Sequence, residues 1–249
     1  MEIEIVKDYI PLISHATWKQ ITELHHRARA ELKDLDIGEP FFPLADAPTG
    51  KAGELLVTFC GIAPGYAKGT TKTYDAAVQG LSRYAEDRFG LNEDGSTKTG
   101  YGMFWHEIAE VRGRLLEAKP RPEIRIGWAN VLPIKDNPDA SHAPQHRKLI
   151  GMQASVSDAI WRDLLLQRKS DIVVATFHPR WFDLDNWPDD RRQWQKRVNG
   201  KLWLKVRTPD LPHVVWVNHK RGRLHDGEPK AADIVKAITD YRADILCHR

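Results

Sequence analysis

The stretch Glu54-Leu-Leu-Val-Thr-Phe-Cys60, followed at once by Gly61-Ile-Ala-Pro-Gly65, decides the fold. An apolar run of this length is typical of a strand that is buried on both faces. Glycine lets the backbone approach a ligand closely, and proline fixes a turn, so this loop suits the presentation of backbone N–H groups. It lacks the Gly-Lys-Ser/Thr ending of a P-loop and the G-x-G-x-x-G spacing of a dinucleotide loop. A turn that merely ends the strand is the other interpretation.

The rest of the chain alternates between apolar strands and amphipathic helices, which predicts an α/β fold with three layers and a mostly parallel central sheet. Strands are predicted at 54–60, 124–132, 171–177, 201–206 and 213–218, and helices at 15–34, 74–88, 103–117, 146–167 and 229–246. We expect residues 1–50 to form a helix and a surface connector outside the α/β domain of residues 51–249. Such sheets bind ligands outside the carboxyl ends of their strands, hence in the loops that begin at Gly61, Asn130, Phe177 and Asn218.

Composition limits the class of protein. The 249 residues are 41% hydrophobic and 29% charged, as in ordinary globular proteins. No apolar run could cross a bilayer, and the first residues lack the basic and apolar regions of a signal peptide, so we expect a cytoplasmic protein without membrane contact. The two cysteines, Cys60 and Cys247, cannot form a disulfide framework or a four-cysteine iron–sulfur or zinc site.

The net charge of +3 is small, but the basic residues gather in the C-terminal third with tryptophans between them. They are Arg191, Arg192, Lys196, Arg197, Lys201, Lys205, Arg207, Lys220, Arg221 and Arg223, with Trp187, Trp194, Trp203 and Trp216. Cations beside aromatic faces suit contact with nucleic-acid phosphates and stacking on bases. The alternative is a solvated helix face with tryptophans that fill a core.

Three short motifs, in this order, resemble the uracil-DNA glycosylase superfamily. They are Gly61-Ile-Ala-Pro-Gly65, Ala129-Asn130-Val131 and Val217-Asn218-His219-Lys220-Arg221-Gly222-Arg223. Between the first two, Gly102-Met-Phe-Trp105 looks like a helix start of the branch that removes uracil or thymine opposite guanine. The resemblance covers about residues 54–245. It implies a uracil-DNA-glycosylase-like domain over 51–249 that binds DNA, flips a nucleotide and cleaves its glycosidic bond without a cofactor or metal.

The resemblance also implies roles for individual residues. Asn130 would pair with a pyrimidine edge, since its amide both donates and accepts, although it could simply cap a strand. Phe104, or else Tyr101, would stack on the base. His219 would donate a hydrogen bond to the pyrimidine oxygen on which charge develops. Further contacts to the base would come from Gly61, Ile62, Ala63, Pro64, Gly65 and Tyr66, and contacts to DNA from Lys220, Arg221, Arg223 and Leu224, with Arg223 or Leu224 as a wedge.

Water activation departs from the family pattern, because Ala63 stands where many members carry Asp or Asn. Asp75 is the nearest carboxylate that could replace it, or it could be an ordinary residue of a first helical turn. Relatives with alanine at this place usually hold an iron–sulfur cluster through four cysteines, which this chain lacks.

Several histidines offer alternatives. His178, in His178-Pro179-Arg180, replaces His219 if 213–218 is not the last strand of the sheet. His142 and His146 are four residues apart, but no third metal ligand accompanies them. His25 and His26 lie in the first helix, and we expect both to face solvent.

The sequence therefore predicts a metal-independent DNA glycosylase for uracil or another modified pyrimidine, with no obligate protein partner. A non-catalytic nucleic-acid-binding relative of the same fold is the alternative, because Ala63 cannot activate water. A hydrolase of free nucleosides or nucleotides is a third possibility.

Overall fold

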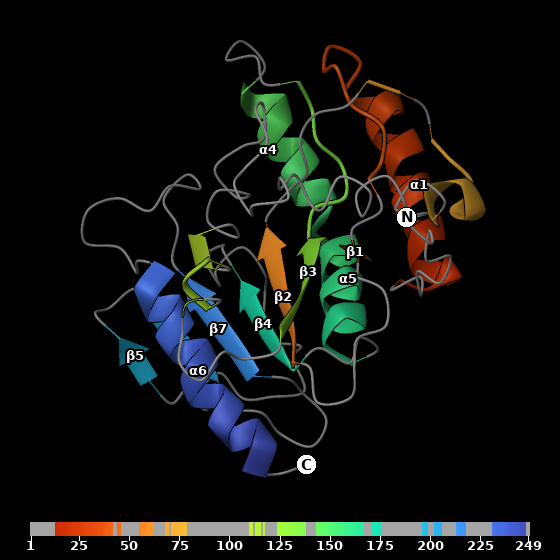
Figure 1. Cartoon of the computed structure of the whole chain (residues 1–249). Helices are drawn as coiled ribbons and strands as arrows, with labels where there is room; N and C mark the ends of the chain where they lie inside the picture. The colour runs from red at the N-terminus through yellow and green to blue at the C-terminus, as the bar shows by residue number, and fades with distance from the viewer. Residues whose placement is uncertain are drawn as a thin grey trace, which may run out of the picture.

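Among the residues that the structure describes, seven strands form one sheet in the order β1-β3-β2-β4-β7-β6-β5 (Figure 1). The computed structural model describes residues 13–41, 44–45, 55–61, 68–69, 71–78, 110–111, 113–115, 117, 124–137, 143–166, 171–175, 196–198, 202–205, 213–217 and 231–247. The strands are β1 (Leu44–Ala45), β2 (Leu55–Gly61), β3 (Ile124–Asn130), β4 (Ile172–Ala175), β5 (Lys196–Val198), β6 (Leu202–Lys205) and β7 (His213–Val217). The named helices are α1 (His15–Glu31), α4 (Ala143–Met152), α5 (Ala154–Leu166) and α6 (Ala231–Cys247).

The four central strands, β3, β2, β4 and β7, are parallel, and the three outer strands pair antiparallel. The predicted α/β fold with a mostly parallel sheet is confirmed at this level. Strand β7 is the last strand of the chain among the described residues and pairs directly with β4. The β2 and β3 strands run side by side from Leu55 opposite Ile124 to Gly61 opposite Asn130.

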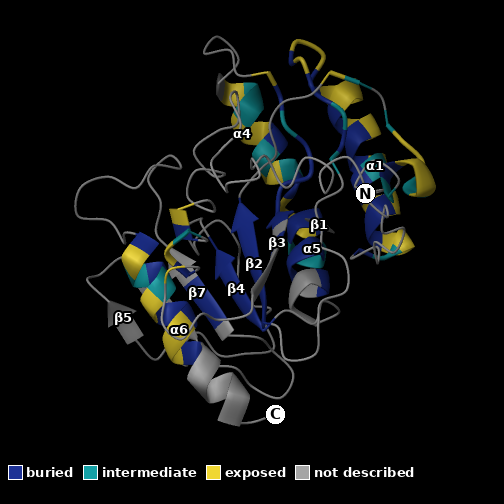
Figure 2. Cartoon of the chain, in the orientation of Figure 1, coloured by how far each residue is buried: buried dark blue, intermediate teal, exposed yellow. Residues whose placement is uncertain are grey.

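Alternate side chains of the sheet enter two separate apolar clusters. Cys60, Val173 and Val214 lie in the cluster that contains α1, α4 and α5, whereas Phe59 and Val174 lie in the cluster that contains α6. Every described side chain of β2 and β4 is buried, as Figure 2 shows in dark blue. Burial on both faces explains why these strands read as continuous apolar runs in the sequence.

The start of α1 is tied to α5 across the fold. Ser14 caps the helix, and its side-chain oxygen accepts from Thr17 N at 3.1 Å. The buried Asp163 carboxylate of α5 accepts from Thr17 Oγ1 at 2.8 Å and from Ser14 N at 3.3 Å. Trp18 and Ile21 of α1 share one apolar cluster with Trp161 of α5, so the N-terminal helix completes the core of the sheet layer.

The single helix predicted over 146–167 is wrong. It is two helices that meet at Gln153, where the backbone N–H bonds to Ile150 O at 3.1 Å. The buried Gln153 side chain accepts from Ile134 N at 3.0 Å. The break therefore satisfies a buried backbone donor of a segment far away in the sequence, which helical periodicity does not reveal.

The connector that was expected to wrap the surface is partly buried, because it pairs with the chain that continues from β3. Leu44 lies opposite Ala129, and Ile37 lies opposite Asp136. Gly38 N donates to Lys135 O, and Asn137 N donates to Asp36 O, both at 2.9 Å. We call the described residues of 36–45, together with 128–137, the ribbon. Its Ile37 and Ile134 are buried in the same cluster as α1 and α4.

Asp171 joins the beginnings of β2 and β4, and its loss should destabilise the sheet. It is 6% exposed; its carboxylate accepts from Leu56 N at 2.9 Å, and its own N–H donates to Leu56 O at 3.0 Å. We expect Asp171→Ala to lower the free energy of unfolding by about 1.5–3 kcal/mol, because a buried N–H loses a charged acceptor. Urea denaturation measures this change.

The matched control for Asp171→Ala is Asp240→Ala on α6. Asp240 is 60% exposed and pairs only with Lys236, four residues earlier, at 3.0 Å among the described residues. An exposed pair of this kind contributes less than about 1 kcal/mol. Equal losses for the two variants would contradict the structural role of Asp171.

Candidate active site

The carboxyl ends of the four parallel strands lie at one edge of the sheet, and two predicted site residues meet there. Gly61 ends β2 directly opposite Asn130, which ends β3. Val131 N donates to Gly61 O at 3.2 Å, which holds the two ends together. The chain passes from β2 to β3 on one side and then to β4 on the other side of β2. Ligands of α/β sheets bind at such a switch point, so this edge is the candidate active site.

Asn130 is 5% exposed although its side chain is polar. Its neighbour Ala129 packs in the cluster of α1, α4 and α5, so strand alternation turns Asn130 to the opposite face, the face of Phe59. A carboxamide in such a dry place can both donate and accept, and its hydrogen bonds to a ligand are stronger than in water. The arrangement suits recognition of a planar group with adjacent donor and acceptor atoms.

Asp75 is exposed and lies in a short helix, residues 74–78, that packs beside α1. Its neighbour Tyr74 stacks on His15 with 3.6 Å between ring centroids, and its hydroxyl donates to Ile13 O at 2.9 Å. Burial, followed by the charges of Asp75 and Asp163, raises the pKa of Tyr74. In Figure 1 this short helix, coloured gold, lies beside α1 and away from the tips of β2 and β3. The structure therefore brings together Gly61 and Asn130, with Asp75 apart from them.

The other predicted site residues lie outside the described part of the chain. They are Ile62, Ala63, Pro64, Gly65, Tyr66, Tyr101, Phe104, His219, Lys220, Arg221, Arg223 and Leu224, with the alternative His178 and the metal candidate His142. Their roles stay predictions. Strand β7 ends at Val217, one residue before Asn218, and β4 ends at Ala175, so both following loops begin at the edge that carries Gly61 and Asn130.

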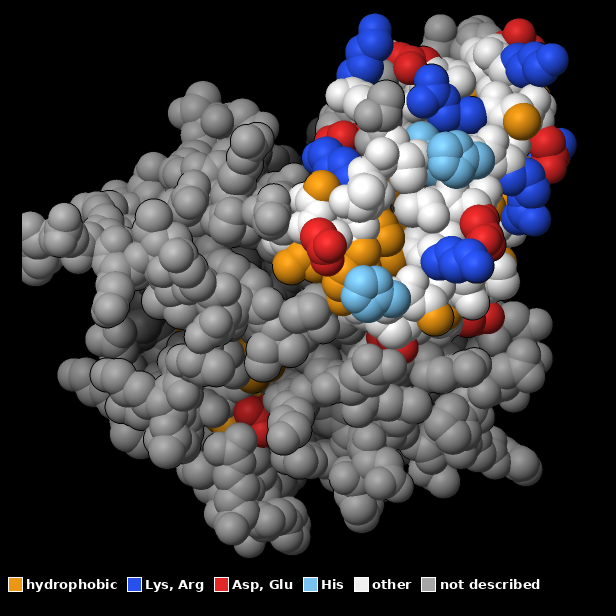
Figure 3. All heavy atoms as spheres, turned by 90° about the vertical axis from the view of Figure 1, so that its right-hand side faces the viewer, with side chains coloured by type: hydrophobic (Ala, Val, Ile, Leu, Met, Phe, Trp, Pro, Cys, Tyr) orange, Lys and Arg blue, Asp and Glu red, His pale blue; other side chains and the backbone are white. Residues whose placement is uncertain are grey.

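The ribbon, α1 and α4 form a wall beyond this edge. Figure 1 shows α4 above the tips of β2 and β3, and the ribbon runs between α4 and α1. Gln145 Nε2 of α4 donates to Asp34 at 3.1 Å, and Lys148 pairs with Glu31 of α1 at 3.1 Å. Figure 3 shows the face around α1, on which Lys, Arg, Asp and Glu are interspersed. The candidate site is thus an edge bounded on the β3 side by a packed lobe.

Sequence reasoning missed one pair in this wall. His146 Nδ1 lies 2.8 Å and 2.9 Å from the two carboxylate oxygens of Asp136. Asp136 is 2% exposed, whereas the His146 side chain is 36% exposed. A histidine and an aspartate ten residues apart carry no sequence signal of their own; only the pairing of the ribbon with α4 brings them together. Among the described residues, no group of three or more His, Cys, Asp or Glu side chains could hold a metal ion.

His25 is buried, so the expectation that it faces solvent is wrong, whereas His26 is exposed. The Nε2 atom of His25 lies 3.1 Å from Gly38 O, which can only accept, so Nε2 carries the proton. Nδ1 then accepts from the hydroxyl of Thr71 at 2.7 Å. Burial, with the charges of Arg29 and His26, lowers the pKa of His25 to about 4. The neutral ring thereby ties α1 to the ribbon and to the segment before Asp75.

The free energy of unfolding should depend on the protonation of His25. As the pH falls from about 6.5 to the folded pKa of about 4, His25 binds a proton in the unfolded chain but not in the folded chain. The free energy of unfolding therefore decreases over this range. The loss is up to about 1.4 kcal/mol per pH unit and about 2–3 kcal/mol over the window. Glutamine keeps a donor and an acceptor without titrating. We therefore expect His25→Gln to flatten this part of the curve of unfolding free energy against pH.

His26→Gln is the matched control for this pH dependence, because His26 is the exposed neighbour on the same helix. It should keep the wild-type slope in urea denaturation across the same pH range. A wild-type slope in His25→Gln would show that other groups cause the dependence.

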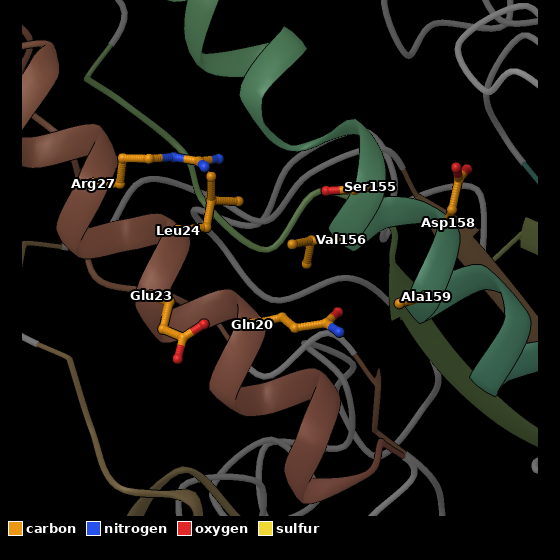
Figure 4. A pocket seen from close by; sticks show the side chains of 8 residues that line it. All are labelled: Gln20, Glu23, Leu24, Arg27, Ser155, Val156, Asp158 and Ala159. Carbon is orange, nitrogen blue, oxygen red and sulfur yellow. The ribbon is translucent and has the colours of Figure 1, made fainter.

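A separate groove of about 530 Å³ lies between α1 and α5 (Figure 4). Its lining residues come only from these two helices: Gln20, Glu23, Leu24, Arg27, Ser155, Val156, Asp158 and Ala159. It includes no residue of the strand ends and does not belong to the candidate active site.

Comparison of the chain with protein-family models, curated proteins and solved structures finds no match. No described helix combines the length and the apolar character that crossing a bilayer requires. The fold defines the chain as an α/β protein with a mostly parallel sheet, and its candidate active site is the edge at Gly61 and Asn130.

Proposed function

We propose that this chain is a DNA glycosylase that flips out uracil or a modified pyrimidine and hydrolyses its N-glycosidic bond. The carrying observation is the meeting of Gly61 and the buried Asn130 at the carboxyl edge of neighbouring parallel strands. A flipped base has a planar edge of donors and acceptors, which a buried carboxamide can read. The finer description of the fold, a uracil-DNA-glycosylase-like three-layer domain, is part of this proposal.

The topology supports the assignment of further roles to loops that begin at the same edge. Asn130 holds the base edge, Phe104 or Tyr101 stacks on the base, and His219 stabilises the charge on the leaving base. His219 follows β7, which is the last described sheet strand in the chain and a parallel neighbour of β4, and this order favours His219 over His178. Lys220, Arg221 and Arg223 contact phosphates.

If the nucleobase departs before water attacks the sugar, the reaction needs little help from a general base. The C1′–N bond breaks, its electron pair leaves with the base, and the sugar approaches an oxocarbenium ion. Hydrogen bonds from Asn130 and His219 stabilise the negative charge on the departing base. Water then adds to C1′ and loses a proton to the solvent, and the departed base anion takes up a proton from the solvent, which leaves an abasic sugar and a free base. This sequence of events agrees with Ala63 in the first motif and with Asp75 beside α1.

The experiment uses the purified full chain and duplex and single-stranded oligonucleotides that contain uracil, a thymine–guanine mismatch or an enlarged cytosine. Alkaline cleavage after incubation reveals abasic sites, and mass spectrometry of the small-molecule fraction identifies the released base. We expect abasic product from at least one substrate. No abasic product from the whole set, with a folded chain confirmed by circular dichroism, overturns the proposal.

A non-catalytic nucleic-acid-binding relative is the second candidate. Ala63, which cannot activate water, favours it, together with the position of the helix 74–78, which carries the exposed Asp75, beside α1. Equal affinity for damaged and undamaged DNA, without any abasic product, supports this candidate. If Asp75→Asn abolishes excision but retains DNA binding, Asp75 is the residue that activates water.

A further inference from the structure

The loop that follows β2 is tied to other segments at both of its ends. At the near end, Gly61 O accepts a hydrogen bond from Val131 N at 3.2 Å, which joins the loop to the residue after β3. At the far end, Thr71 and the residue after it contact α1 and the ribbon. The base contacts predicted at 62–66 lie between these two ends in the sequence. The N-terminal helix and the ribbon therefore set where the far end of the loop lies.

His25 of α1 makes the central contacts of the far end. It is 1% exposed, and burial lowers its pKa to about 4, so the ring is neutral at neutral pH. Nε2 donates to Gly38 O of the ribbon at 3.1 Å, and Nδ1 accepts from the Thr71 hydroxyl at 2.7 Å. A single ring thus joins α1, the ribbon and the loop.

Neighbouring contacts hold the same end of the loop. Trp18 Nε1 of α1 donates to Lys72 O at 3.2 Å, and Lys72 Nζ pairs with Glu39 Oε1 of the ribbon at 3.3 Å. Gly69 lies so close to Glu39 that an added Cβ would stand 3.2 Å from the Cβ of Glu39. The loop is therefore packed on the ribbon before the chain reaches its bond to His25.

The helix α1 has other contacts that hold it to the sheet layer. Thr17 Oγ1 donates to the buried Asp163 of α5 at 2.8 Å, and Ile21 packs in the apolar cluster of the sheet. The hydrogen-bond partners of His25 lie instead on the ribbon and on the loop. Burial of an imidazole is unfavourable unless its nitrogens are bonded, so these partners are the ones that its position requires. The two bonds of His25 fix the loop more than they fix the helix.

A loop that is fixed before a ligand arrives favours binding and chemistry. Each residue that becomes ordered on binding costs conformational entropy, and a loop with two fixed ends has fewer conformations to lose. Reacting groups must also meet within a narrow range of geometry, so a small displacement slows a reaction. The position of Thr71 thus affects the edge that carries Asn130, through the loop that begins at Gly61.

We propose that His25 is a positioning residue for the candidate active site, an inference that rests on the proposed function. By holding Thr71 beside the ribbon, it fixes the far end of the loop after β2. The residues predicted to contact the base, 62–66, are thereby held at the edge that carries Asn130. His25 acts through the loop and touches neither the base nor the sugar.

Limited trypsin digestion under native conditions measures this anchor without any need for activity. Lys68 is exposed and lies in the loop before Thr71. Mass spectrometry follows cleavage after Lys68, with cleavage after Lys236 of α6 as the internal reference. We expect cleavage after Lys68 to be about 10-fold faster in His25→Ala than in the wild type, because two hydrogen bonds are lost. His25→Gln keeps a donor and an acceptor and should stay within about twofold of the wild type.

Thr71→Val tests the same contact from the loop without opening a cavity. Valine has the shape of threonine but cannot donate to Nδ1 of His25, so cleavage after Lys68 should be about 5-fold faster. The matched control is Thr239→Val on α6, whose exposed hydroxyl bonds within its own helix; it should be cleaved as the wild type is. Equal cleavage after Lys68 in the two threonine variants overturns the proposal. An equal rise after Lys68 and Lys236 in His25→Ala indicates global unfolding and also overturns it.

The rate of excision shows whether the anchor serves the candidate active site. At saturating enzyme, His25→Ala should form abasic sites about 10-fold more slowly than the wild type, and His25→Gln should recover the wild-type rate. The affinity of His25→Ala for the same duplex without a target base should be unchanged, because the proposed phosphate contacts are at Lys220, Arg221 and Arg223. A residue with a purely structural role would lower stability in urea without this selective loss of rate.

The two readouts separate this inference from the proposed function. If the wild type forms no abasic product, the glycosylase is refuted, and faster cleavage after Lys68 in His25→Ala still supports the anchor. Excision at the wild-type rate in His25→Ala refutes the positioning role alone. Wild-type cleavage after Lys68 in His25→Ala overturns the inference whatever the rate of excision.

Discussion

Replacing Asn130 with alanine is expected to slow the proposed base excision by about 100- to 1000-fold, the range observed when one donor to a developing negative charge is removed. Asn130 ends β3 opposite Gly61 and is 5% exposed, so no water takes over its hydrogen bonds readily. Alanine keeps the backbone pairing and removes only the carboxamide. The measurement is the single-turnover rate of abasic-site formation on the oligonucleotide that gives the most abasic product with the wild-type chain.

Asn137→Ala is the matched control, since Asn137 is an exposed asparagine at the far end of the ribbon. Its single-turnover rate should stay within about twofold of the wild type, as expected for a surface substitution away from the chemistry. Circular dichroism and urea denaturation of both variants show whether the fold is retained. A wild-type rate in Asn130→Ala would remove Asn130 from the site and leave the proposed function without its carrying observation.

Replacing Trp161 with alanine should lower the free energy of unfolding by about 3–5 kcal/mol, the usual cost of truncating a large core aromatic residue. Trp161 is 2% exposed and is the largest fully buried side chain among the described residues. It lies in the cluster that joins α1, α4 and α5 to the sheet. A stability of about 5–15 kcal/mol is typical of a domain, so this loss is a large part of the total. Urea denaturation followed by circular dichroism measures it.

Ser155→Ala on the same helix is the control for Trp161→Ala, because Ser155 is exposed. It should change the free energy of unfolding by less than about 0.5 kcal/mol. Trp161→Phe retains most of the apolar volume and should fall between these two variants. A loss below about 1 kcal/mol in Trp161→Ala would contradict the packing of α5 on the sheet.

The strands were predictable because their pattern is local. Leu55–Gly61 and Ile172–Ala175 are buried on both faces, so each is an apolar run that stands out from its neighbours. Their alternation with helices was enough to predict a mostly parallel sheet and to direct attention to its carboxyl edge. The helix predicted over 146–167 failed because the bond from Ile134 N to Gln153 comes from a segment almost twenty residues away.

The candidate site was predictable only in part. Gly61 and Asn130 were named from short motifs at strand ends, and the structure sets them opposite each other. The burial of His25 was not predictable, since its partners Gly38 and Thr71 come from two other segments. A polar residue on a helix is expected to face solvent unless such partners are known.

The sequence by itself predicted the strands β2, β3, β4, β6 and β7, whereas β1 and β5 were not predicted. Residue period and side-chain volume decide these features within a few neighbouring residues. Only the tertiary structure decided that Asn130 lies beside Gly61, that the connector pairs with 128–137, and that Asp136 holds His146. Each of these contacts depends on the register between segments distant in the chain. Register follows from the packing of the whole core, which no local pattern contains.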